Sequence, residues 1–594
     1  MPFIQSTSMD PISAAGIGLA VVPLVIQVFA GCVKGYQLLA EVEGMPAAYQ
    51  HLRVRLRVEQ TRLLNWGEKV GLVEELLDHP SKTLQLDRNL VFDILLEIQA
   101  LFKDCVKITD KYDHKVPLKQ DPVQVEATFD RRFPRGTNAV LTKILNVVEK
   151  APQVGGRLKW AMVKQEAFKA TLEKLIGYND AIEGLLDRTS IGQLHEMQHQ
   201  TYMVMLQLNS KVDELKQMSM AIQVKTQPLD RQTPNGLSRA STLVAGQDDE
   251  NASLADLADF KARQRQVEQE GSSVNLQPIR ADAVVLKSSD STRSEAVYFG
   301  KSVWIEWKAY VPDNHFPPSW DRMIEDRVKQ LAKLLGSPGK PKEFRAPQCL
   351  GYIEEKSEEE RRFGFVYEKP GDVASTTKPV SLLELIKTMK MPSLTKRRAL
   401  AHALSQSLMY LHSVNWLHKG IRSNNVVFFG QPGNEVALAE PVLSGFEYAR
   451  PDLTGEMTEP TPRYSENDVY KHPHTLSIAR PLSKKSDDVY SMGVVLIEIA
   501  YWRSIADIVS LPKDTKAARS MVKKVRGMLI EREFLEGIEG IAGELYQEAV
   551  RKCLTGGEEL GLSKNADETD PEVGAAMHET YSKEIVGRIS DMRV

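Results

Sequence analysis

Cysteine is scarce in this sequence, and its scarcity narrows the chemistry that the chain can carry. The 594 residues include four cysteines, Cys32, Cys105, Cys349 and Cys553, which lie far apart. The sequence has neither a Cys-x-x-Cys pair nor a cluster of cysteine and histidine, so it predicts no metal site and no disulfide framework. A reducing, intracellular compartment is the simplest interpretation.

An excess of positive charge is also missing. The net charge is −3 at pH 7, which gives no electrostatic reason to expect nucleic acid as a partner. Hydrophobic residues make up 42% of the chain and charged residues 26%, as in an ordinary globular protein.

Long hydrophobic runs are absent except for one. Residues 11–33, PISAAGIGLAVVPLVIQVFAGCV, contain no charged residue, and this segment of 23 residues is long enough to span a bilayer as a helix. No second segment rivals it, which excludes a membrane protein with many spans. Residues 1–10 contain neither Lys nor Arg, so we do not expect a secretion signal, and Met9 remains an alternative start to Met1.

The first third of the sequence has helical periodicity. Apolar residues recur every three or four positions at about 52–72, 84–111, 137–149, 158–187 and 191–221, with short breaks such as the Gly155-Gly156 pair. Amphipathic helices must bury their apolar stripes against one another. We therefore expect residues 10–222 to form a helical bundle that begins with the apolar segment.

A polar stretch follows, from 223 to 283, and it is predicted to be a flexible linker. Within it, residues 253–270 could form a short charged helix, although a mostly solvated segment is the favoured interpretation. Ser241 follows Arg239 by two positions and is a candidate phosphorylation site.

The last part of the chain has strand-like segments first and helical segments after them. Strands are expected at AVVLK, AVYFG, SVWIEWKAYV and GFVYEKP, and helices at 397–418 and 487–503. This order predicts a two-lobed α+β domain over 284–556, with a C-terminal tail at 557–594.

Two stretches of this region carry a recognisable pattern. LHKGIRSNNVVFF at 417–429 resembles the catalytic loop of protein kinases, and VLSGFEYAR at 442–450 resembles their metal-binding loop. DVYSMGVVLIEI, from Asp488, resembles a further kinase helix with its structural aspartate, and His474 replaces the usual acid at the end of the activation segment. In this resemblance Gly420 and Gly445 stand where the catalytic and metal-binding aspartates belong.

Those two glycines imply a kinase-like domain without catalysis. One aspartate accepts the proton of the substrate hydroxyl, and the other holds the metal that neutralises phosphate charge. Glycine offers no side chain for either task, unless Asp487 or Glu447 rescues metal binding. The resemblance makes Lys308 the strand lysine and Asn425 the metal-binding asparagine, so weak ATP binding through this pair stays open and no cofactor is certain. Arg327 falls where the partner glutamate of the lysine would lie.

The N-terminal region also carries a family pattern, in which Arg55-Leu56 and Arg62-Leu63 lead to Trp66-Gly67 after an apolar first helix. This order resembles the fungal prion-inhibition and propagation domain, called HeLo, over about residues 10–220. The resemblance implies a cell-death or heterokaryon-incompatibility effector whose first helix leaves the bundle and enters the membrane. The end of the chain lacks the polar amyloid repeat that some family members carry.

The two resemblances together predict a multidomain protein: an all-α, HeLo-like helical bundle followed by an α+β, two-lobed, protein-kinase-like domain. The architecture is similar to that of the mixed-lineage kinase domain-like executioner of animal necroptosis. It implies a cytoplasmic protein that moves to the plasma membrane on activation, with membrane lipids, further copies of itself and an upstream nucleotide-binding-oligomerisation receptor as partners. A divergent active Ser/Thr or Tyr kinase and a signalling scaffold with no membrane role remain as alternatives.

The membrane hypothesis depends on one face of the apolar segment. The residues expected to insert are Ile17, Val21, Leu24, Val25 and Val28. Each gains about 1.5–3 kcal/mol from burial, and lipid tails are as apolar as a protein core. The free-energy difference between the stored and inserted states is therefore expected to be small, so that a partner or modification worth a few kcal/mol shifts it. The basic residues nearby, Arg53, Arg55, Arg57 and Arg62, are candidates to meet anionic headgroups.

Overall fold

The computed structural model describes residues 11–42, 44–72, 86–105, 163, 165–226, 247–270, 276–289, 293–310, 319–356, 361–370, 377–430, 437–451, 466–476, 482–512, 515–563 and 566–593. The chain divides into two compact units. Unit 1 comprises Met1–Asn209 and Lys216–Ala255, and unit 2 comprises Ser210–Leu215 and Asp256–Val594. The domain boundaries proposed from the sequence stay predictions.

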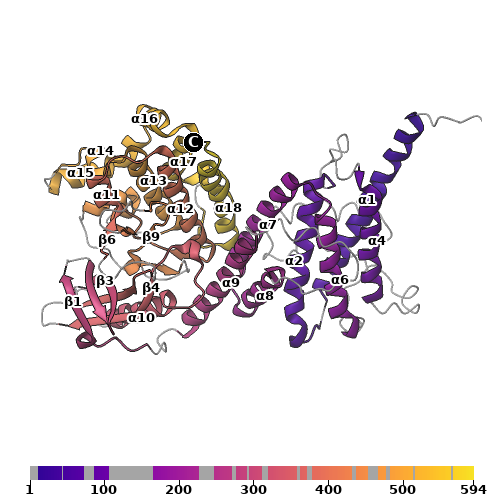
Figure 1. Ribbon diagram of the computed structural model, residues 1–594, viewed down its shortest axis with the longest axis horizontal. Helices are drawn as coiled ribbons and strands as arrows, with labels where there is room; N and C mark the ends of the chain where they lie inside the picture. Colours follow the sequence, from indigo (N-terminus) through magenta and orange to yellow (C-terminus); the bar gives the residue numbers. More distant parts are fainter. Residues whose placement is uncertain are drawn as a thin grey trace, which may run out of the picture. The chain divides into compact units, whose positions relative to one another are not determined.

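Unit 1 is helical, as the periodicity predicted (Figure 1). Its helices are α1 (Pro11–Ala40), α2 (Ala47–Val70), α4 (Arg88–Cys105), α6 (Gln165–Glu183) and α7 (Arg188–Leu208), and α8 (Val212–Thr226) follows at the division between the units. The helix predicted at 137–149 lies outside the described residues. The run predicted at 191–221 is interrupted between α7 and α8, where Asn209 caps α7 with extended backbone.

Local signals explain where these helices stop and start. Gly71 ends α2 with a left-handed backbone, φ 84°, and its N–H donates to the Glu68 carbonyl, an arrangement that glycine adopts without strain. The Asp187 carboxylate accepts the backbone N–H of Ser190 at 2.8 Å and caps the start of α7.

Among the residues described, no helix combines the length and the apolar character that crossing a bilayer requires.

The region predicted as a flexible linker contains a helix with a buried face. Helix α9 runs from Gln247 to Glu270, where a mostly solvated segment was expected. The Phe260 ring is fully buried in unit 2, with its centroid 4.9 Å from the ring of Phe344 and 5.6 Å from that of Trp416. The expectation failed because the buried face of α9 includes the polar side chains of Lys261 and Gln264, which a sequence pattern assigns to solvent.

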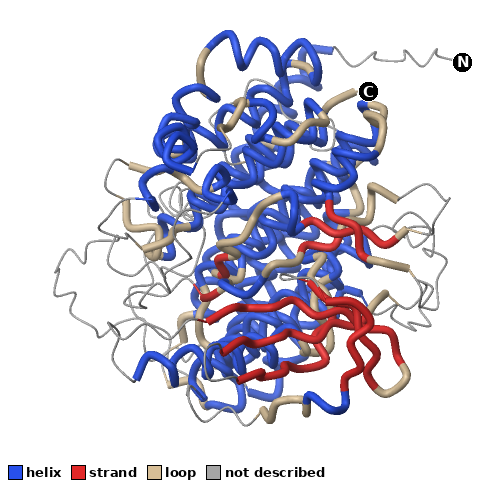
Figure 2. Tube along the Cα trace, turned by 90° about the vertical axis from the view of Figure 1, so that its left-hand side faces the viewer, coloured by secondary structure: helices blue, strands red, loops and turns tan. Residues whose placement is uncertain are grey.

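Unit 2 contains an antiparallel sheet of five strands in the order β1-β2-β3-β5-β4 (Figure 2, red). The strands are β1 (Val284–Ser289), β2 (Arg293–Tyr298), β3 (Lys301–Tyr310), β4 (Gln348–Lys356) and β5 (Arg361–Glu368), and helix α10 (Ser319–Leu335) packs on β4. Strand β4 was not predicted, because it contains a bulge between Cys349 and Gly351 and ends in charged residues. The four expected strands are confirmed as β1, β2, β3 and β5.

The remainder of unit 2 is largely helical. Its helices are α11 (Leu382–Thr388), α12 (Leu394–Ser413), α13 (Lys485–Tyr501), α14 (Ile505–Ile508), α15 (Thr515–Leu529), α16 (Arg532–Ala542), α17 (Glu544–Thr555), α18 (Pro571–Tyr581) and α19 (Arg588–Asp591). Short strands pair as β6 (Pro379–Ser381) with β8 (Val426–Phe429), β8 with β9 (Val442–Leu443), and β7 (Trp416–Leu417) with β10 (Arg450–Pro451). The region is therefore mixed α/β.

The residues predicted as a C-terminal tail include two of these helices. A π-helical turn, Ser582–Gly587, joins α18 to α19. Ile585 and Ile589 are fully buried, and the Tyr581 hydroxyl donates to the Ser405 carbonyl of α12 at 3.3 Å. This end of the chain thus belongs to the core of unit 2.

Candidate functional site

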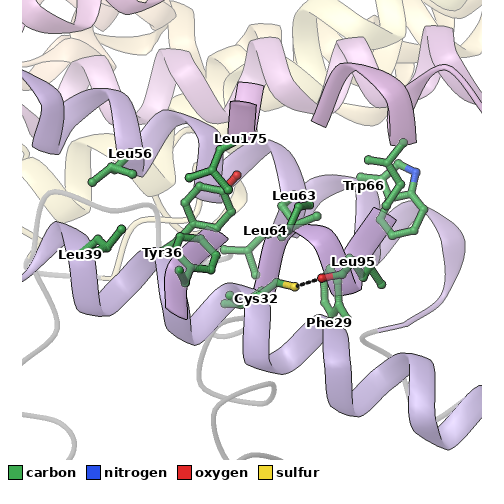
Figure 3. Packing of buried hydrophobic residues seen from close by; sticks show 14 of the residues in the cluster. Phe29, Cys32, Tyr36, Leu39, Leu56, Leu63, Leu64, Trp66, Leu95 and Leu175 are labelled. Atoms are coloured by element: carbon green, nitrogen blue, oxygen red, sulfur yellow. Dashed lines mark hydrogen bonds between the residues drawn. The ribbon is translucent and has the colours of Figure 1, made fainter. Parts of the chain in front are cut away.

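Helix α1 carries the residues predicted to enter the membrane. Val25 and Val28 are 2% and 7% exposed, whereas the side chains of Ile17, Val21 and Leu24 lie outside the described residues. The described part of α1 turns an apolar face into the core of unit 1, as Figure 3 shows for Phe29, Cys32, Tyr36 and Leu39. Pro23 lies within the helix without ending it.

Glycines let α1 approach its neighbours closely. A Cβ atom on Gly67 of α2 would overlap the Phe29 ring of α1, and one on Gly35 of α1 would overlap the Phe102 ring of α4. Polar contacts also reach α1: the Cys32 thiol donates to the Leu95 carbonyl at 3.1 Å (Figure 3), and the Gln60 amide donates to the Val33 carbonyl at 3.3 Å. The Gly67 of the sequence pattern therefore has a steric role, because it is part of the surface on which α1 rests.

Arg62 is buried, whereas a residue that contacts lipid headgroups would have to face solvent. Its side chain is 1% exposed and forms ion pairs with Glu59 at 2.8 Å, Asp180 at 2.6 Å and Glu183 at 2.7 Å. Asn179 also donates to Glu59 at 2.9 Å. The expectation for Arg62 was wrong because its charge is neutralised inside unit 1, where it ties α2 to α6. Arg53, Arg55 and Arg57 are partly exposed.

In unit 2, the two glycines of the kinase resemblance lie against each other and against Asn425. The Asn425 side-chain amide donates to the Gly420 carbonyl at 2.8 Å. A Cβ atom on Gly420 would come within 2.7 Å of the Gly445 carbonyl oxygen, and one on Gly445 would overlap the Asn425 side chain. Gly445 also has φ +82°. The volume that an aspartate side chain would need is therefore already occupied.

Two charged side chains of the sheet, Glu306 and Arg293, contact the loop that contains Gly445. The Glu306 carboxylate of β3 accepts the Gly445 backbone N–H at 2.9 Å and pairs with Arg293 of β2 at 2.8 Å. Arg293 also donates to the Ser444 hydroxyl at 3.0 Å. We call these four residues, Arg293, Glu306, Ser444 and Gly445, the strand–loop clasp. Sequence reasoning missed Glu306, although it stands two positions before Lys308.

Lys308 is 3% exposed, and its ammonium group faces the loop after β9. It donates to the main-chain carbonyl of Glu447 at 2.7 Å and lies 4.6 Å from the centroid of the Tyr448 ring. Burial raises the pKa of the Glu447 carboxyl. The pocket that adjoins Lys308 and Arg327 has a volume of about 10 Å³, room for about one water molecule.

Helix α10 supplies the acid near the position expected to pair with Lys308. Its Glu325 pairs instead with Lys329 at 2.6 Å and with Arg361 at 3.0 Å. These two partners hold the pKa of the Glu325 carboxyl below its ordinary value.

Asp488 at the start of α13 holds the loop that contains Gly420. Its carboxylate accepts the backbone N–H groups of His418 at 2.7 Å and of Lys419 at 2.8 Å. Lys419 has φ 62°, a left-handed conformation that these hydrogen bonds help to fix. Burial lowers the pKa of the His418 imidazole to about 4, so that its ring is neutral at pH 7.

A third group of side chains escaped sequence reasoning. His472, His474 and Asp487 bring one potential ligand atom each within 4.8 Å of one another. His474 Nε2 lies 2.5 Å from an Asp487 carboxylate oxygen, and the two imidazole centroids are 4.7 Å apart. Asp487 was considered for a kinase-like metal site, yet it lies beside the histidines and not beside Gly445. The His-Pro-His spacing was the signal that could have found this group.

Two family models match the chain. Residues 16–218 match the HeLo family, described as prion-inhibition and propagation, so the N-terminal region is a HeLo domain. Residues 358–592 match a domain of unknown function, DUF7580. That match does not identify a kinase.

Two curated proteins of the fungus Podospora anserina are distant relatives. Heterokaryon incompatibility protein S (strain S) is 23% identical over 155 residues, which are 26% of this chain and 53% of that protein. Heterokaryon incompatibility protein s is 23% identical over 159 residues, again 26% and 53%. The chain thus spans about half the length of the curated relatives that it matches.

Proposed function

We propose that this HeLo-domain protein is an effector of cell death or heterokaryon incompatibility, in which α1 leaves unit 1 and inserts into the plasma membrane. The observation that carries the proposal is the nature of α1. Its first 23 residues contain no charge, and its described residues are held by apolar packing. The distant similarity to two heterokaryon incompatibility proteins supports the same function.

The contacts of α1 make its release energetically accessible. Val25, Val28 and Phe29 give up their burial in the protein core when α1 leaves, and burial in lipid returns a similar free energy. The balance between the two positions is then a difference of a few kcal/mol, which a binding partner can reverse.

Unit 2 is the proposed receiver of the signal. We propose that it has a protein-kinase-like fold without phosphate transfer, supported by the Gly420–Asn425–Gly445 packing and by the strand–loop clasp. Weak ATP binding through Lys308 and Asn425 has less support, because both side chains donate to main-chain carbonyls. An upstream nucleotide-binding-oligomerisation receptor and self-association at the membrane complete the proposal.

Dye release from anionic liposomes tests the membrane step. The samples are the full chain, the chain without residues 1–33, and residues 1–226. We expect residues 1–226 to release dye, the full chain to release it after activation, and the truncated chain to bind and release nothing. Leakage that is unchanged by removal of residues 1–33 would refute the proposal.

The enzyme alternative has its own test. Incorporation of labelled phosphate that disappears in Lys308→Ala would establish a divergent kinase. The scaffold alternative would be favoured if residues 1–226 failed to bind anionic liposomes at all.

A further inference from the structure

His472, His474 and Asp487 come from two elements that approach each other in unit 2. Both histidines lie in the segment 466–476, His474 within the short 3₁₀ helix Pro473–Leu476. Asp487 lies in the first turn of α13. Two imidazoles and a carboxylate are a ligand set that borderline transition metals prefer, above all zinc.

The Asp487 carboxylate is already oriented. One oxygen accepts the Lys484 backbone N–H at 2.9 Å, and the other points at His474 Nε2. The carboxylate therefore keeps its cap on α13 while the second oxygen remains available to a cation.

The His472 ring is also fixed in place. It packs edge-on against Tyr490 of α13, with centroids 5.0 Å apart. Its Nδ1 accepts a long hydrogen bond of 3.3 Å from the His474 backbone N–H. A metal ion bound to Nδ1 would take the place of this weak hydrogen bond. A metal ion bound to Nε2 would leave the ring proton on Nδ1, which could then no longer accept the His474 N–H.

The distances leave room for one small ion after a modest adjustment. Tetrahedral zinc with bonds of about 2.0–2.2 Å requires ligand atoms about 3.4 Å apart. His474 Nε2 and the Asp487 oxygen, now 2.5 Å apart, would separate by roughly 1 Å. The His474 side chain is 35% exposed, so the ion can enter from solvent and a water molecule can complete its coordination.

We propose that His472, His474 and Asp487 bind one zinc ion, which fastens the segment 466–476 to helix α13. The site is separate from Gly420 and Gly445, and its expected effect is to stabilise the contact between this segment and α13. Mg²⁺ and Ca²⁺ are poor candidates, because these hard cations prefer shells built from oxygen. Arg526 is the cationic neighbour that opposes binding, and its guanidinium is engaged by the carbonyls of Leu554 and Thr555.

The test uses the full chain purified without a polyhistidine tag, stripped of metal and then given ZnCl₂. We expect one zinc per chain after gel filtration, a rise of several degrees in the thermal midpoint, and no rise with MgCl₂. Co²⁺ in place of zinc should give the intense visible absorption of a tetrahedral site. His474→Gln should abolish all three effects, whereas His402→Gln, a partly buried histidine of α12, should keep them.

Asp487→Asn is the second variant, because it retains an oxygen that can cap α13. Loss of zinc in both His474→Gln and Asp487→Asn, with thermal midpoints of the metal-free proteins close to the original, supports the site. Wild-type protein that retains no zinc, or variants that retain as much as wild type, would overturn it. Neither outcome bears on membrane insertion, which the liposome assay tests separately.

Discussion

At the scale of single residues, Gly445 has a backbone conformation and close contacts that leave no room for a side chain. Its positive φ and the Asn425 side chain beside it leave no place for a Cβ atom. The Glu306 carboxylate accepts a hydrogen bond from the backbone N–H of Gly445. The contacts of this loop therefore oppose an aspartate at position 445.

Gly445→Asp should therefore destabilise unit 2 and produce no phosphate transfer. A left-handed non-glycine residue costs about 1–3 kcal/mol, and overlap with Asn425 adds to this cost. Thermal unfolding should show a lower midpoint, and assays with labelled ATP should show no incorporation. An unchanged midpoint would contradict the packing described for Gly420, Asn425 and Gly445.

Glu498 of α13 provides a prediction on pH. Its buried carboxylate accepts the Tyr470 hydroxyl at 2.7 Å and the Ile505 N–H at 2.8 Å, and burial raises its pKa to about 7. Because the folded state holds this proton more tightly than the unfolded state, the stabilisation is complete below the unfolded pKa and is lost as the pH rises through about 7.

Glu498→Gln removes the charge and should therefore gain stability relative to wild type as the pH rises. We expect the variant's thermal midpoint, minus that of wild type, to be higher at about pH 8 than at about pH 5, by the equivalent of up to roughly 3 kcal/mol. Glu539→Gln, at an exposed position of α16, serves as the control and should show no such trend. A difference that is constant with pH would refute the assignment.

At the scale of elements, the packing of α1 against α2 and α4 depends on glycines as much as on apolar side chains. Gly67→Ala would drive a methyl group into the Phe29 ring, and overpacking of this kind costs about 1–3 kcal/mol. The variant should weaken the hold on α1, so we expect faster hydrogen exchange in residues 25–40 and liposome leakage without activation.

Gly177→Ala is the matched control, because a Cβ on this glycine of α6 meets nothing within 4 Å. It should stabilise its helix by about 0.5–1 kcal/mol and leave leakage low. Equal leakage from Gly67→Ala and Gly177→Ala would show that the glycine contact does not hold α1.

The elements also show what the sequence can predict. Periodicity located α2, α4 and α6, because burial of one face imposes it on the residues themselves, and α1 was found as an apolar run without charge. Strand β4 was missed because a bulge interrupts its alternation, and the burial of α9 was missed because polar residues such as Lys261 and Gln264 are buried beside its apolar ones. Arg62 was misjudged for a related reason: its partners Asp180 and Glu183 are more than a hundred residues away. The glycines at 420 and 445 were visible in the sequence, whereas the clasp with Glu306 needed three-dimensional contacts.

At the scale of the whole molecule, the charge of the chain bears on how it would meet a membrane. A net charge of −3 is repelled weakly by an anionic surface. Under the proposed function, the apolar α1 supplies the attraction. Liposome binding through inserted apolar residues should then persist at high salt, whereas liposome binding through basic side chains should be lost.

Binding of the activated full chain to anionic liposomes should change little between about 0.1 M and 1 M salt, over which the Debye length falls from about 10 to 3 Å. Sedimentation with liposomes measures this, and the chain without residues 1–33 should remain in the supernatant at both concentrations. Release of the bound chain by high salt would indicate an electrostatic attachment and contradict insertion.

The close packing of α1 in the core of unit 1 has a consequence for the lifetime of the activated protein. Removal of Phe29 and Tyr36 would uncover Trp66, Leu95 and Phe102, which form part of one apolar cluster. Exposed apolar surface of this kind promotes self-association and attack by proteases. A chain that had released α1 would therefore be consumed by assembly or degradation, and the cell would need newly synthesised protein to respond a second time.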